Sequence, residues 1–147
     1  MGRLLGIATR TATRVPMAEP ARARISTESG VEGDFRGRPG PRQVTVLARE
    51  GFEAACAELG VALPWTIRRA NLFVEGVDLV GSVGATLVIG DVRLAITAEC
   101  DPCRVMDLQH EGLRAALAPA WRGGVSCRVL RSGEVAIGDR TELRRMR

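Results

Sequence analysis

The chain has 147 residues and a formal charge of +4, and all 21 of its basic residues are arginine. This length is typical of one domain whose core needs no disulfide or metal staples, and no composition shift divides the chain. Because lysine is absent, no side-chain amine can form an internal aldimine, which excludes catalysis on covalently bound pyridoxal phosphate. We therefore expect a single domain over residues 1–147.

The N-terminal segment carries no targeting signal. Its apolar run, residues 4–8, is too short for a signal peptide, and no stretch approaches the roughly 18–20 apolar residues of a membrane helix. We expect a cytoplasmic protein without a membrane partner, whose four cysteines are reduced thiols. The all-arginine basic set suits phosphate and pterin recognition, although genomic base composition is the simpler explanation.

Seven short segments have strand signals, because they are β-branched or alternate in polarity and are punctuated by glycine. Short strands at this spacing predict a mainly β fold, built as a barrel or curled sheet. Residues 89–92 and 131–134 are expected as tight hairpin links between neighbouring strands. The seven predicted strands are residues 4–9, 43–47, 71–75, 86–89, 92–97, 126–130 and 135–137.

Two segments are expected as short helices. Residues 49–59 place their apolar side chains in one stripe that includes Cys56, so this cysteine is expected in the core. Residues 111–117 form the second predicted helix. Residues 15–24 and 33–41, rich in Pro, Arg and Gly, lack periodicity and are expected as loops, where ligand contacts concentrate.

The densest chemical signal is the Cys-x-x-Cys pair of Cys100 and Cys103, at the end of a predicted strand. A structural zinc site would need further ligands from Cys56, Cys127 or His110, and no second paired motif supplies them. A thioredoxin-like redox pair would need a βαβ setting that the chain lacks. Two interpretations remain: an exposed thiolate activated by neighbouring positive charge, and thiols packed as small apolar residues.

Six motifs occur along the chain in one order: SGVEGD at residues 29–34, RQVTVL at 42–47, RRANLFVEG at 68–76, DPC at 101–103, RGGVSCRVL at 122–130 and IGD at 137–139. This series resembles the MOSC family, the domain at the C-terminus of molybdenum cofactor sulfurases and in mitochondrial-type amidoxime reductases. The resemblance covers about residues 30–139. It implies a standalone domain with a pyruvate-kinase-like β-barrel and about two short helices.

The resemblance also implies a cofactor and its site. A protein of this family binds the molybdenum cofactor in its molybdopterin form, through a cysteine that ligates molybdenum or carries sulfur, and Cys103 matches that cysteine by position. Arg69 and Asn71 match an Arg-x-Asn element that contacts the cofactor. A thiolate suits a thiophilic metal, and arginine and amide donors can hold a phosphate and a pterin edge. Further expected cofactor contacts are Arg42, Arg68 and Thr97.

The chain departs from the family pattern at one position, and several other notable residues are expected to have purely structural roles. Family members often carry a histidine soon after the Gly-Asp pair, where this chain has Phe35 and Arg36. Cys127 alternates with apolar residues on one strand face and is expected in the core. The remaining expectations are surface exposure for His110, core-edge positions for Trp65 and Trp121, and turn or backbone-capping roles for Glu32 and Asp34.

Three functions fit the resemblance: reduction of N-hydroxylated compounds, relay of a persulfide sulfur with Cys103 as carrier, and non-catalytic storage or delivery of the cofactor. The chain has no fused aminotransferase-like or ferredoxin-like module, so it is not a complete sulfurase. The expected partners are a sulfur-donating desulfurase, an electron-donor protein or a molybdoenzyme apoprotein. Nucleic-acid binding ranks last, because no arginine stripe with interleaved aromatic residues is present.

Overall fold

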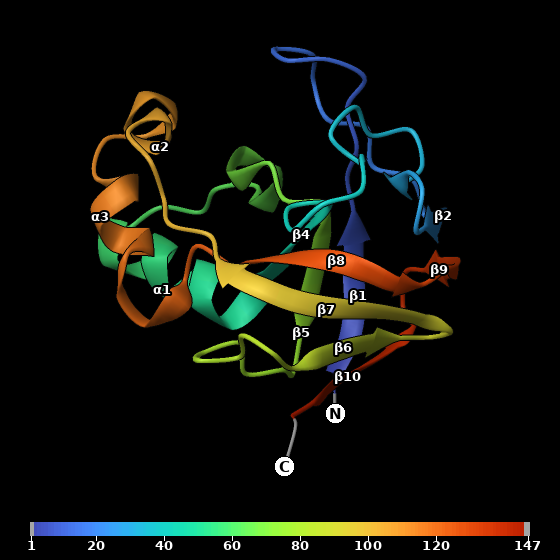
Figure 1. The fold of residues 1–147 in the computed structure, drawn as a ribbon. Helices are drawn as coiled ribbons and strands as arrows, with labels where there is room; N and C mark the ends of the chain where they lie inside the picture. Colours follow the sequence, from blue (N-terminus) through green and yellow to red (C-terminus); the bar gives the residue numbers. More distant parts are fainter. Residues whose placement is uncertain (1, 146–147) are drawn as a thin grey trace.

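A closed seven-stranded barrel dominates residues 2–145, the part of the chain that this computed structural model describes (Figure 1). Neighbouring strands run antiparallel around the barrel, except β4 and β5, which are parallel. The barrel confirms the predicted mainly β fold. In spatial order the strands are β1 (Gly2–Ile7), β10 (Arg140–Arg144), β6 (Thr86–Ile89), β7 (Val92–Glu99), β8 (Val125–Arg131), β4 (Val44–Ala48) and β5 (Leu72–Glu75).

A small three-stranded sheet stands beside the barrel, in the order β3 (Gly30–Val31), β2 (Arg22–Ser26) and β9 (Gly133–Ala136). Its strands correct two predictions. Residues 22–24 belong to β2, although residues 15–24 were expected as a loop. The hairpin expected at residues 131–134 is wrong, because β9 pairs with β2 and the chain there leaves the barrel for the small sheet. The hairpin at residues 89–92 is confirmed, with Ile89 opposite Val92.

The helices are short and lie outside the barrel. The predicted first helix is confirmed as α1 (Arg49–Leu59), closed by Gly60 in the left-handed conformation at φ 68°. The second is α3 (Leu113–Leu117), two residues shorter at its start than predicted. The sequence did not predict β10, α2 (Val105–Gln109) or the 3-10 turns η1 (Trp65–Arg68) and η2 (Pro119–Trp121).

None of the helices in the described part of the chain has the length and apolarity needed to cross a membrane.

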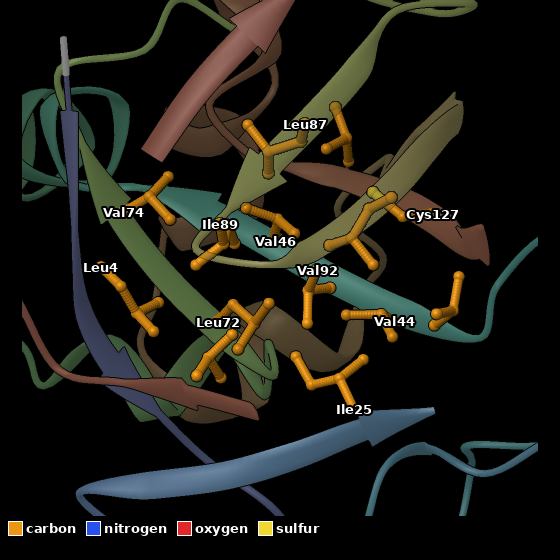
Figure 2. Packing of buried hydrophobic residues seen from close by; sticks show 14 of the residues in the cluster. Leu4, Ile25, Val44, Val46, Leu72, Val74, Leu87, Ile89, Val92 and Cys127 are labelled. Atoms are coloured by element: carbon orange, nitrogen blue, oxygen red, sulfur yellow. The ribbon is translucent and has the colours of Figure 1, made fainter. Parts of the chain in front are cut away.

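Two apolar clusters hold the fold together. The barrel interior is filled by alternate residues of the strands, including Val46, Leu72 and Cys127 (Figure 2). Leu47 and Phe73, which alternate with them, pack outside the barrel under α1 and α3. Trp65 stacks on Phe73 at a centroid distance of 5.0 Å, which is the core-edge position expected for it.

Cys127 gives a stability prediction. Its side chain is fully buried in the barrel, and burial raises the pKa of its thiol, with Cys100 adding to the effect. We expect Cys127→Ser to lower the free energy of unfolding by about 1–3 kcal/mol, because it places a hydroxyl without a partner in an apolar core. Urea unfolding measures this. Cys127→Ala is the control and should cost less than serine; equal or greater loss with alanine contradicts the explanation.

Candidate functional site

The segment that links β7 to α2, residues 100–104, carries two of the four cysteines and is called the cysteine loop below. Cys103 is exposed and Cys100 is half-buried. The backbone of Cys100 is held at both polar groups: its N–H donates to the Gly124 carbonyl at 2.8 Å, and its carbonyl accepts from Arg68 Nη2 at 3.1 Å. The first cysteine is therefore anchored to the strand end, while the second presents its thiol on the surface.

Arg68, at the end of η1, organises the cysteine loop. Its Nε donates to the Gly123 carbonyl at 3.0 Å, in addition to the bond from Nη2 to Cys100. Burial lowers the pKa of Arg68, and the charges of Cys100 and Cys103 oppose this. A Cβ at Gly123 would meet the Cys100 carbonyl at 2.2 Å, so only glycine fits in this packing. These bonds give Arg68 a positioning role, and its contact with a cofactor stays a prediction.

Two more of the predicted residues lie around Cys100. Burial raises the pKa of the Cys100 thiol, while Arg68, a hydrogen bond with Ser126 and the charge of Arg42 lower it. The Thr97 hydroxyl lies 3.0 Å from the Ser126 carbonyl and also meets the carbonyl of Pro41. Arg68 thus bonds to the cysteine loop directly, and Thr97 bonds to the neighbouring strand β8. Contact of Arg42, Arg68 and Thr97 with a cofactor stays a prediction.

A second feature at the same end of the barrel is an open groove with a volume of about 520 Å³, called the arginine groove below. Figure 1 shows the loop after β1 and helix α2 at this end. The last residue of α2, Gln109, lines the groove, and α2 follows the cysteine loop in the chain. The lining residues are Arg10, Arg14, Val15, Pro16, Met17, Pro64, Thr66, Ile67, Arg69 and Gln109.

Arg10 is the most unusual residue of the arginine groove, because it is charged and only 7% exposed. Among residues 2–145 its guanidinium forms no ion pair or hydrogen bond, and it lies over the ring of Phe35 at 5.1 Å. Burial lowers the pKa of Arg10, and Arg69 and Arg36 lower it further, whereas Asp34 raises it. An unpaired cation that lines a groove among like charges is arranged to receive an anion.

The loop that carries Phe35 is fixed from inside the protein. Arg36 stacks on the same ring, also at 5.1 Å, and Asp34 accepts the backbone N–H groups of Arg10 and Arg36, as expected of a capping residue. Buried Gln43 holds the base of the loop: its Nε2 donates to the Thr27 and Gly37 carbonyls, and its Oε1 accepts from Val129 N. The position where the family pattern suggests a histidine thus carries a Phe-Arg pair, and the ring of Phe35 lies against Arg10.

Arg69 lines the groove from the end of η1, in the left-handed conformation at φ 62°. Arg14, on the opposite loop, has φ 69°. Each such conformation costs a non-glycine residue roughly 1–2 kcal/mol, and strain of this kind concentrates at ligand sites. Two strained arginines therefore face the groove.

Asn71 lies two residues after Arg69 but has a different setting. It is 6% exposed, its Oδ1 accepts from Thr45 N at 3.1 Å, and its Nδ2 donates to the Ala8 carbonyl at 3.2 Å. The Thr45 hydroxyl also lies 3.3 Å from Oδ1. The amide thus bridges β4 to the end of β1, with one Nδ2 hydrogen left over. Its contact with a cofactor stays a prediction, and Arg69 alone of the two lines the groove.

Sequence reasoning missed Arg10 and Arg14, which precede the first recognised motif. A basic residue a few positions after a strand, as Arg10 is after β1, carries no signal of its own. Across residues 2–145, no three or more His, Cys, Asp or Glu side chains lie together as a group that could hold a metal ion.

Comparison with known proteins gives a family match and several similar structures. The family model of the MOSC domain matches residues 32–142. No curated protein matches the sequence. The YuaD protein from Bacillus subtilis has a TM-score of 0.80 at 18% identity, over 100% of this chain and 98% of that one. YiiM from Geobacillus stearothermophilus has a TM-score of 0.77 at 15% identity, over 97% of this chain and 75% of that one. YiiM from Escherichia coli has a TM-score of 0.67 at 17% identity, over 99% of this chain and 71% of that one.

Proposed function

Because the match spans residues 32–142 of 147, the chain belongs to the MOSC domain family, and from this premise we propose that it binds the molybdenum cofactor between the arginine groove and the cysteine loop. The family is generally associated with this cofactor. Molybdopterin is an anion that carries a phosphate and a pterin, so a suitable site offers cations at one end and a soft metal ligand at the other.

The unpaired guanidinium of Arg10, a residue that is only 7% exposed and lines the open groove, is the observation that carries the proposal. It has no acceptor among residues 2–145, and Arg69 and Arg36 repel it. A bound phosphate would satisfy its donors and neutralise the repulsion, because arginine pairs with phosphate through a planar, bidentate fork. Arg14 and Arg69, which line the same groove, add two more cations for the anionic end of the cofactor.

The cysteine loop supplies the metal-binding end of the proposed cofactor site. Cys103 exposes a single thiol next to the anchored Cys100, and a thiolate is a soft ligand that suits a thiophilic metal. Arg68 holds the loop in place through its bonds to the Gly123 and Cys100 carbonyls. When bound, the cofactor supplies a metal centre that exchanges electrons or sulfur; the residues of the chain bind, orient and expose it.

Two activities follow from such a site: reduction of an N-hydroxylated compound, and relay of a persulfide sulfur through Cys103. The second is favoured by a second thiol in the same loop, since Cys100 lies three residues before Cys103 and is held there by the bond from Arg68 to its carbonyl. We expect electrons or sulfur to come from a separate donor, an electron-donor protein or a desulfurase. Reduction of an amidoxime by the loaded protein with a chemical reductant tests the first activity. Metal loading without turnover favours a carrier that delivers the cofactor to an apoenzyme.

Elemental analysis tests the proposal directly. Protein produced in a host that makes the cofactor is expected to contain stoichiometric molybdenum, with phosphorus in a fixed ratio to the metal. Molybdenum at background level in freshly purified, folded protein contradicts cofactor binding.

The role of Arg10 is tested by Arg10→Met. We expect at least about a tenfold loss of molybdenum and phosphorus content, because the phosphate loses one of its cations. The thermal midpoint of the cofactor-free protein should stay the same or rise, because the substitution removes the repulsion of Arg10 by Arg69 and Arg36. The matched control is Arg93→Met, which alters an exposed arginine at the far end of β7. It should change neither the molybdenum and phosphorus content nor the thermal midpoint. A lower midpoint with unchanged loading would show that Arg10 is structural.

A further inference from the structure

In the described part of the chain, a second hollow shares no lining residue with the arginine groove. Its volume is about 380 Å³, and it opens between the start of α1, the loop that follows β5 and the turn η2. Figure 1 shows this loop, in yellow-green before β6, on the side of the barrel where α1 lies. The hollow is called the tryptophan pocket below, and its walls are formed chiefly by Val77, Leu79, Val80 and Trp121, with the carboxylates of Glu50 and Asp78.

The apolar wall of the tryptophan pocket is built on the barrel interior. Val77 and Trp121 are partly buried and pack against the interior cluster, while Leu79 is buried and Val80 is 46% exposed. Trp121 and the preceding Ala120 both have left-handed backbones, at φ 60° and 53°. Such strain in non-glycine residues concentrates at ligand sites. The wall thus offers an aromatic ring, held in a strained turn, to the apolar body of a small ligand.

The two carboxylates of the pocket each have one oxygen bound to its wall. Glu50 Oε2 accepts the Gly76 N–H at 2.8 Å, and Asp78 Oδ1 accepts the Val80 N–H at 3.1 Å. Among residues 2–145 neither carboxylate forms an ion pair, and the second oxygen of each accepts no hydrogen bond. The pocket therefore combines an apolar wall with negative charge that these residues leave unneutralised.

The arginines around the pocket have other partners. Arg49 and Arg122, which flank lining residues in the chain, pair with Glu75 and Glu58. Arg145 donates to three backbone carbonyls of the loop after β5, and within residues 2–145 it pairs with no carboxylate. These three bonds fix the loop, so the pocket is formed before any ligand arrives.

We propose that the tryptophan pocket binds a small organic ammonium ion whose apolar body rests on Trp121. The ammonium group binds the second oxygens of Glu50 and Asp78, and the indole ring attracts the same charge through its face. The inference goes beyond the proposed function and does not rest on it, because the arginine groove attracts anions whereas this pocket attracts cations.

A titration of the full, isotope-labelled chain with phenethylammonium, followed by NMR, tests the proposal. The signals of the Trp121 indole N–H and of the Gly51 and Gly76 amides are expected to shift and saturate, while the Trp65 indole signal stays in place. Phenethyl alcohol and phenylacetate carry the same ring without the positive charge, and each should bind at least about tenfold more weakly. Binding of the cation should weaken as the salt concentration rises.

Two conservative variants remove the negative charges. Glu50→Gln and Asp78→Asn each keep an oxygen that can accept the same backbone N–H group, so the pocket should keep its shape. Each is expected to bind phenethylammonium about threefold more weakly, and the double variant about tenfold. Glu134→Gln, which alters an exposed carboxylate of β9, is the matched control and should leave the affinity unchanged.

Three results overturn the proposal: phenethyl alcohol that binds as tightly as the ammonium ion, a double variant with wild-type affinity, and shifts confined to residues of the arginine groove. Thermal midpoints establish that each variant is folded. The comparison of the three ligands uses the wild type alone, so it decides the question of charge even where a variant is unstable.

Discussion

Cys103→Ser is expected to lower the molybdenum content of the protein at least about tenfold, because a hydroxyl is a poor ligand for a soft metal. The side chain is exposed and packs in neither apolar cluster, so the thermal midpoint of the cofactor-free protein should stay close to that of the wild type. Elemental analysis and thermal unfolding of the same preparations measure the two effects.

Cys100→Ser provides the comparison for this variant. It changes a thiol three residues away in the same loop, and Arg68 still holds the loop through the carbonyl of residue 100. Molybdenum content should therefore be retained. If Cys103→Ser keeps its molybdenum while Cys100→Ser loses it, the metal ligand has been assigned to the wrong cysteine.

Asn71→Ala is expected to lower the free energy of unfolding by about 3 kcal/mol or more. Truncation removes the acceptor of Thr45 N and the donor to the Ala8 carbonyl, and each buried group left without a partner costs about 1–3 kcal/mol. Denaturant unfolding of the cofactor-free protein measures the loss.

Arg69→Met is the matched control, since it alters the other member of the same Arg-x-Asn element. The backbone of residue 69 stays left-handed with either side chain, so stability should change little, while molybdenum and phosphorus content should fall. A stable Asn71→Ala protein that fails to load cofactor would instead make Asn71 a direct contact, as the family resemblance suggests.

Local patterns explain which elements could be predicted. The stripe of α1 and its stop at Gly60 lie within twelve consecutive residues, and both are local properties of the chain. Strand β2 was missed because its five residues, which alternate in polarity, adjoin a Pro- and Arg-rich stretch without periodicity. Its partner β9 also lies more than a hundred residues away, with Ile25 opposite Gly133. Pairing over such a distance leaves no signal in either segment alone.

The residues of the candidate site also fall into those that the sequence could predict and those that only the structure shows. Cys103 and the residues around it could be found, because a Cys-x-x-Cys motif and an ordered series of motifs carry them. Arg10 could not, since its importance comes from burial, from the Phe35 ring and from the charges of Arg69 and Arg36, which only the fold assembles. Asn71 was located correctly, but only the structure shows its bridge to Thr45 and Ala8.

The buried charge of Arg10 has a consequence for the lifetime of the protein. An anion that binds the folded chain and not the unfolded one shifts the folding equilibrium by mass action, and more so when it relieves repulsion already present. The loaded protein should then expose its chain to proteases less often than the empty protein does. Degradation would remove the empty form first, so that the quantity of protein in a cell would follow the supply of its ligand.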